Sequence, residues 1–72
     1  MDRLEGTMTA KEFNAALGRL DLSVYASAPA LGISLRQAQR YSREEAPVPQ
    51  PIAKLLRLAL RAKLTREELR DL

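Results

Sequence analysis

The chain has 72 residues, a net charge of +3, and neither cysteine nor histidine. Without thiols and imidazoles there is no disulfide framework, no Cys/His zinc site and no histidine general base, so we expect no enzyme activity, metal or cofactor. Aromatic residues are too few for the stacking platforms of single-strand binders. No apolar run approaches the roughly 20 residues of a membrane span. The first residues do not resemble a signal peptide, so we expect a cytoplasmic protein with no membrane partner.

The positive charge is concentrated in the second half of the chain. Residues 34–64 carry seven basic and two acidic side chains, a local net charge of +5, whereas the segments before and after are each −1. Such asymmetry favours a polyanionic partner.

The spacing of apolar residues predicts an all-α fold of four to five short helices and no strand. Residues 1–8 show little apolar periodicity and are expected to form a flexible tail, with residues 9–72 forming one domain. The first helix is expected over residues 9–20, where Thr9 and Glu12 match a capping box. Its apolar stripe is expected to pack against the next two helices.

Two short helices, expected over residues 24–30 and 35–43, meet at a glycine corner. Gly32 can adopt a positive φ at little cost. Ser34 is expected to cap the second helix, with Gln37 completing a capping box. A basic helix after such a corner is typical of the helix-turn-helix, whose second helix enters the major groove of DNA.

At about 100° per residue, one face of the helix at 35–43 carries only basic and amide side chains. These are Arg36, Gln39, Arg40 and Arg43. Arginine offers bidentate donors to phosphate and guanine, and glutamine suits adenine. An ordinary solvated face usually mixes both signs of charge, so this single-signed face favours nucleic acid as the partner.

Closely spaced prolines predict an extended connection over residues 46–51, which Val48 is expected to pin to the core, and then a helix over residues 51–62. The apolar arc on this helix is wider than one core-facing stripe requires. We expect the surplus near Leu58 and Ala62 to be covered by the C-terminal segment or by a second copy of the chain.

The last helix is expected over residues 66–72, after a capping box of Thr65 and Glu68. Its Leu69 and Leu72 are expected to dock on the preceding helix. A homodimer would then form through the helix at 51–62 or through this C-terminal segment.

The chain resembles the phage-repressor-like (Xre/Cro-type) helix-turn-helix regulators of bacteria and their phages. The likeness covers residues 9–62 and is carried by Ala28, Gly32 and Ser34, in the pattern A-x-x-x-G-x-S, and by the later stretch PVPQPIAKLLRL. Members of this family are all-α, lambda-repressor-like domains that bind duplex operator DNA, commonly as dimers. The resemblance implies a sequence-specific DNA-binding regulator of transcription, most simply a repressor, with the helix at 35–43 in the major groove.

The resemblance also assigns roles to individual residues. Base-edge contacts fall on Leu35, Arg36, Gln39 and Arg40. Phosphate contacts fall on Ser23, Val24 and Arg43. Core positions fall on Ala28, Leu31, Ile33, Ala38 and Tyr41. The family often has glutamine where Val24 stands, so backbone N–H groups would make that phosphate contact here.

Several of these residues have a plainer interpretation. For Arg36 and Arg40 the alternative is contact with phosphate alone. Tyr25 is expected in the core or at its rim, and the alternative is a contact of its hydroxyl with phosphate. Lys54 is expected on a solvated face, and among the basic residues of its helix it is the best placed to reach the DNA backbone.

Related proteins often carry a glycine near the position of Glu44, which ends the recognition helix. Because this chain lacks it, we expect the helix to run longer, and Glu44 and Glu45 to temper the basic face. Arg43 then has an ion pair with Glu44 as its alternative to phosphate.

The alternative function is a small helical protein-interaction module, such as an antitoxin or a phage accessory factor. It would use the apolar surplus of the helix at 51–62. A salt titration against duplex DNA distinguishes the two, because only DNA binding depends steeply on salt.

Overall fold

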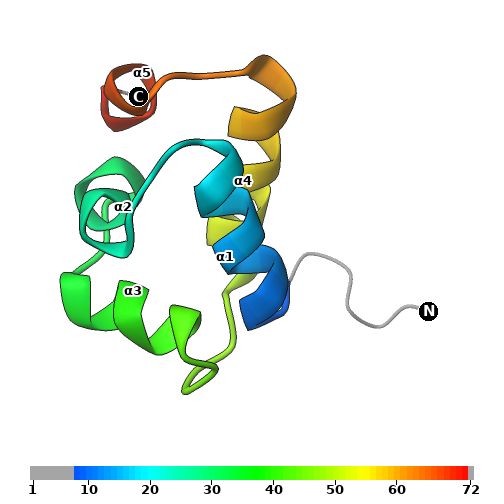
Figure 1. Ribbon diagram of the computed structural model, residues 1–72, viewed down its shortest axis with the longest axis vertical. Coiled ribbons are helices and arrows are strands. Elements are labelled where there is room, and N and C mark those ends of the chain that lie inside the picture. The colour runs from blue at the N-terminus through cyan, green and yellow to red at the C-terminus, as the bar shows by residue number, and fades with distance from the viewer. Residues whose placement is uncertain (1–7, 72) are drawn as a thin grey trace.

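The computed structural model describes residues 8–71, which form five helices and no named strand. The helices are α1 (Ala10–Arg19), α2 (Val24–Leu31), α3 (Leu35–Ser42), α4 (Gln50–Ala62) and α5 (Arg66–Arg70). The predicted all-α fold is confirmed. α1 packs against α3 and α4, and α2 packs against α3 and α5 (Figure 1). Among the described residues, no helix is long and apolar enough to span a bilayer.

The predicted tail lies outside the described residues except for Met8. Met8 is half-buried and pairs with Val48 in an isolated antiparallel bridge. Val48 is itself buried in the core, as predicted. The segment before α4 is therefore anchored both by its side chain and by its backbone.

The predicted helix starts are confirmed by their hydrogen bonds. In α1 the Thr9 hydroxyl oxygen accepts from the Glu12 N–H at 3.1 Å, and the Glu12 carboxylate accepts from the Thr9 N–H at 2.9 Å. The same reciprocal pair forms at α3 and at α5, from Ser34 with Gln37 and from Thr65 with Glu68. Each capping box satisfies two N–H groups, one of them a first-turn donor with no acceptor inside its helix.

The corner between α2 and α3 depends on one left-handed residue. Gly32 has φ 72°, and the Ile33 N–H donates to the Ala28 carbonyl at 3.0 Å, the bond that closes a helix end of this type. Pro29 lies in the last turn of α2 and does not end the helix, which continues to Leu31. The chain therefore turns within three residues, and α3 begins directly after its cap.

α3 is shorter than predicted, because Glu44 takes the conformation that a glycine usually supplies. The helix ends at Ser42, Glu44 has φ 65°, and the Glu45 N–H donates to the Arg40 carbonyl at 2.8 Å. A positive φ is uncommon for a residue with a side chain. The bond from the Glu45 N–H satisfies a carbonyl in the last turn of α3, which offsets part of the cost of this conformation.

The core lies between the five helices. Phe13 and Leu56 are its largest fully buried side chains. The ring of Tyr41 contacts the ring of Phe13 edge to face, with centroids 5.8 Å apart. The predicted core positions Ala28, Leu31, Ala38 and Tyr41 are buried, and Ile33 is half-buried against the same cluster.

α5 packs mainly against α2, whereas the sequence predicted docking on α4. The turn after α4 passes through Lys63 at φ 56° and carries the chain across to α2, where Leu69 is buried (Figure 1). Leu72 lies outside the described residues. α5 consequently leaves Leu58 on α4 uncovered, with 53% of its surface exposed.

Two glycine substitutions test the corner against a matched control. A Cβ at Gly18 or at Gly32 would meet no atom within 4 Å, so both sites have room for a side chain. They differ in backbone conformation, because only Gly32 has a positive φ. We expect Gly32→Ala to destabilise the domain by about 1–2 kcal/mol, because alanine resists the left-handed region. Gly18→Ala should stabilise α1 by up to about 1 kcal/mol. Thermal denaturation should show shifts of opposite sign, of about 4–8 °C per kcal/mol; equal shifts would contradict this account.

Candidate nucleic-acid interface

α3 has one buried face and one exposed basic face. Ala38 and Tyr41 point into the core and are buried. Arg36, Arg40 and Arg43 are exposed, and Gln39 is half-buried beside them. The helical spacing places these four on the side opposite Ala38 and Tyr41. The structure thus brings the predicted basic face together on the surface.

Two consecutive residues of α1 hold two consecutive residues near the end of α3. Phe13 contacts Tyr41 edge to face, with the ring planes at 77°. The Asn14 amide donates to the Ser42 carbonyl at 3.0 Å, and the Ser42 hydroxyl donates to the Asn14 side-chain oxygen at 2.6 Å. The apolar contact fixes how close α3 lies to α1, and the paired hydrogen bonds fix its direction.

The role of Asn14 was not predicted. Asn14 and Ser42 are 28 residues apart, and neither belongs to a local capping pattern. The one signal in the sequence is that Asn14 directly follows Phe13, at the edge of the apolar stripe of α1. A polar residue at such an edge can reach a neighbouring helix, but its partner cannot be read from spacing alone.

α2 holds α3 from the other side. Ala28 and Ala38 are both buried and small, and α2 and α3 are in extensive contact. Ser27 is also fully buried, and its hydroxyl donates to the Val24 carbonyl at 2.6 Å, so it needs no partner outside α2. Its burial therefore costs little and leaves the packing surface of α2 essentially apolar.

The predicted phosphate contacts on α2 differ in exposure. The Ser23 hydroxyl oxygen accepts from the Ala26 N–H at 3.0 Å, and Val24 is half-buried against the core. Tyr25 is 69% exposed, so the expectation that it lies in the core or at its rim is wrong. The N–H groups of Val24 and Tyr25 lie in the first turn of α2, where a helix offers them no acceptor.

Two predicted contact residues remain, Leu35 on α3 and Lys54 on α4. Leu35 is half-buried at the first position of α3, next to Arg36. Lys54 is exposed on α4, which packs against α1 and has no comparable contact with α3. Of the predicted contacts, Lys54 is therefore the one that lies apart from the helix-turn-helix.

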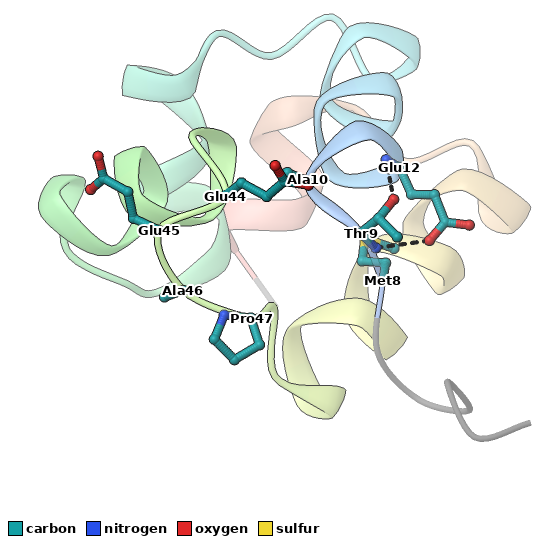
Figure 2. Close-up of a pocket in the computed structure, with 8 residues that line it drawn as sticks. All are labelled: Met8, Thr9, Ala10, Glu12, Glu44, Glu45, Ala46 and Pro47. Atoms are coloured by element: carbon teal, nitrogen blue, oxygen red, sulfur yellow. Dashed lines mark hydrogen bonds between the residues drawn. The ribbon is translucent and has the colours of Figure 1, made fainter.

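The turn after α3 and the start of α1 enclose a hollow of about 380 Å³, which we call the acidic hollow. It is lined by Met8, Thr9, Ala10, Glu12, Glu44, Glu45, Ala46 and Pro47. Figure 2 shows the Glu44 side chain directed toward Ala10, whereas Glu45 points away from the hollow. The first turn of a helix favours nearby negative charge, so the exposed Glu44 carboxylate is favourably placed near the start of α1.

No protein-family model matches the chain, and no match is found among curated proteins or solved structures. Function is therefore inferred from the geometry and charge of α3 and its neighbours.

A double-mutant cycle tests the tether between α1 and α3. We expect Asn14→Ala to lower the free energy of unfolding by about 1 kcal/mol, since each such hydrogen bond contributes about 0.5–1.5 kcal/mol. Combined with Ser42→Ala, the effects should be non-additive by at least about 0.5 kcal/mol. Asn14→Ala with Ser34→Ala is the matched control, because Ser34 caps the other end of α3. Ser42→Ala keeps the backbone carbonyl that the Asn14 amide also bonds, so additive effects would show that the bond between the two side chains contributes nothing.

Proposed function

We propose that the chain binds duplex DNA sequence-specifically, with α3 in the major groove, and acts as a bacterial or phage transcriptional regulator. The observation that carries the proposal is the side of α3 away from the core, where Arg36 and Arg40 are exposed beside the half-buried Gln39. The exposed Arg43 follows at the C-cap. An α-helix with its side chains is about 10–12 Å wide, which fits a major groove about 12 Å wide.

The spacing on α3 suggests how bases would be read. Arg36 and Arg40 are four residues apart, so they lie about 6 Å apart along the helix axis. This is about two base-pair steps of 3.4 Å. Each arginine could then hydrogen-bond one guanine, while Gln39 between them suits adenine. Leu35, at the start of the helix, offers an apolar contact for a thymine methyl group.

Phosphate contacts would come from both sides of this helix. Arg43 lies at the C-terminal end of α3, beyond the residues assigned to bases. On α2, the N–H groups of Val24 and Tyr25 stand at a helix N-terminus, where an anion is favoured. The exposed Tyr25 hydroxyl and the Ser23 hydroxyl, which can still donate while its oxygen accepts, would add two neutral donors.

The contacts behind α3 support specificity as well as affinity. A side chain that reads a base must be held within a fraction of an ångström of its place. The Phe13–Tyr41 contact and the Asn14–Ser42 hydrogen bonds hold α3 before any ligand arrives. Less conformational entropy is then lost on binding.

The protein-interaction module remains the second candidate function. One observation favours it: Leu58 is 53% exposed on α4 and α5 does not cover it. Because α4 and α3 expose different surfaces, the two functions are compatible in one molecule.

Substitution of the two central arginines tests base recognition. We expect Arg36→Ala and Arg40→Ala each to lose about 1–3 kcal/mol of discrimination at one position of the bound site. Selection of sites from a random duplex pool, followed by gel shift, measures this. Arg19→Ala is the matched control, since Arg19 is exposed on α1 and should leave preference unchanged. Full specificity in both α3 variants would refute the proposed reading face.

Salt dependence separates charged from neutral phosphate contacts. We expect Arg43→Ala to weaken binding to all duplexes and to reduce the salt slope by about 1. Tyr25→Phe should weaken binding with the slope unchanged, because a hydroxyl releases no counterion. Titrations at several salt concentrations measure both. A wild-type affinity independent of salt would contradict DNA binding through this surface.

A further inference from the structure

The capping box of α3 uses only half of the Gln37 amide group. The side-chain oxygen of Gln37 accepts from the Ser34 N–H at 3.2 Å and from the Ser34 hydroxyl at 3.4 Å. The amide nitrogen carries two further N–H groups, and no described group accepts a hydrogen bond from either of them. Gln37 is exposed. Its side chain therefore offers two hydrogen-bond donors to a ligand, while its acceptor is already in use.

The capping boxes of α1 and α5 use glutamate where the box of α3 uses glutamine. The carboxylates of Glu12 and Glu68 accept from the N–H groups of Thr9 and Thr65, at 2.9 and 2.8 Å. A negative charge in the first turn of a helix also interacts favourably with the helix dipole. Glutamate would therefore serve the stability of α3 at least as well as glutamine does. The neutral residue indicates a requirement other than capping.

The whole helix-turn-helix shares this lack of negative charge. No aspartate or glutamate occurs between Asp21 and Glu44, although the chain has nine acidic residues in all. The first turns of α2 and α3 accordingly contain no acidic residue, whereas those of α1 and α5 do. A carboxylate on this surface would repel a polyanion. A glutamine at the cap keeps the start of α3 as free of negative charge as the rest of the surface.

Gln37 lies at one edge of the basic face of α3. Gln37 and Arg40 are three residues apart and are neighbours on the helix surface, whereas Arg36 is about 100° away around the axis. Tyr41, four residues after Gln37, is buried, so Gln37 stands between the arginines and the core-facing side. When a helix lies in the major groove, the edges of its outer face are closest to the sugar-phosphate backbones that border the groove.

We propose that the Gln37 amide donates a hydrogen bond to a phosphate oxygen of the DNA backbone while its own oxygen caps α3. This inference rests on the proposed binding of α3 to duplex DNA. The free oxygens of a phosphodiester can only accept, which matches a side chain with only donors left. Glutamine is among the side chains that contact phosphates in protein–DNA complexes. Because the cap already holds the amide, little rotamer freedom is lost on binding.

Gln37→Glu separates the cap from the proposed contact. Glutamate keeps a side-chain oxygen for the Ser34 N–H, but it replaces both amide N–H groups with an anionic oxygen. We expect a melting temperature equal to or above that of the wild type, since the cap is retained. We expect the affinity for duplex DNA to fall by at least about tenfold, because a hydrogen bond to a charged group is lost and a repulsion is added. Thermal denaturation and fluorescence anisotropy at low ionic strength measure the two.

The loss should be similar for a selected site and for an unrelated duplex, because a phosphate contact carries no sequence information. Arg19→Gln is the matched control for charge. It lowers the net charge by the same one unit, on the exposed surface of α1, and should weaken binding much less. Gln37→Met is neutral and keeps the backbone N–H that the Ser34 hydroxyl caps, but it has no amide. It should also bind more weakly than the wild type.

Four outcomes would overturn the proposal while DNA binding by α3 still stands. Gln37→Glu could bind as tightly as the wild type, or it could melt well below it, which would show that the fold needs the amide. Gln37→Met could keep full affinity, which would show that the position needs only to be uncharged. A change in sequence preference would place the amide on a base. A wild type that binds no duplex at low salt would instead refute the proposed function, and this inference with it.

Discussion

The edge-to-face contact between Phe13 and Tyr41 fixes α3 to the rest of the domain. Phe13 is fully buried in the centre of the core, and Tyr41 is the one aromatic residue of α3. Such a contact contributes about 0.5–1.5 kcal/mol beyond the burial of area. Because Tyr41 must face Phe13, the arginines on the opposite side of α3 must face outward. The exposure of the basic face is therefore a consequence of core packing.

The backbone bounds α3 with two left-handed turns. Gly32 before the helix and Glu44 after it both have positive φ. Each turn is closed by an N–H that donates to the carbonyl five residues earlier, from Ile33 to Ala28 and from Glu45 to Arg40. α3 is thus limited to two turns of helix, short enough to lie within one stretch of groove. Only the first turn uses glycine; the second passes through Glu44.

Much of this architecture could be predicted from the sequence, because it depends on local patterns. The capping boxes at α1, α3 and α5 each need only two residues three apart, and the apolar spacing of α1 marks its buried face. The end of α3 could not be predicted in this way. The sequence offers no glycine or asparagine at the end of α3 to mark the residue that takes the left-handed conformation.

Long-range contacts account for the other differences. The position of α5 on α2 depends on how the chain crosses the molecule after Lys63, and the capping box at Thr65 carries no information about that path. The Asn14–Ser42 hydrogen bonds join two helices, and neither residue belongs to a local sequence pattern that would predict its partner. For the candidate interface, the basic residues of α3 were predicted from helical spacing. The exposure of Tyr25 was not predicted, because an aromatic residue beside a core segment is more often buried.

Basic and acidic side chains lie on different surfaces of the domain. α3 exposes arginine, α4 exposes lysine and arginine beside leucine, and the hollow between α1 and the turn after α3 holds carboxylates. A titration of isotope-labelled protein with a random-sequence duplex at low ionic strength, followed by NMR, tests the central claim most directly. We predict that amide shifts concentrate at residues 34–43 and at the first turn of α2, and disappear as salt is raised. No shifts at low salt, or shifts confined to α4 and α5, would contradict the assignment of α3 as the DNA-binding surface.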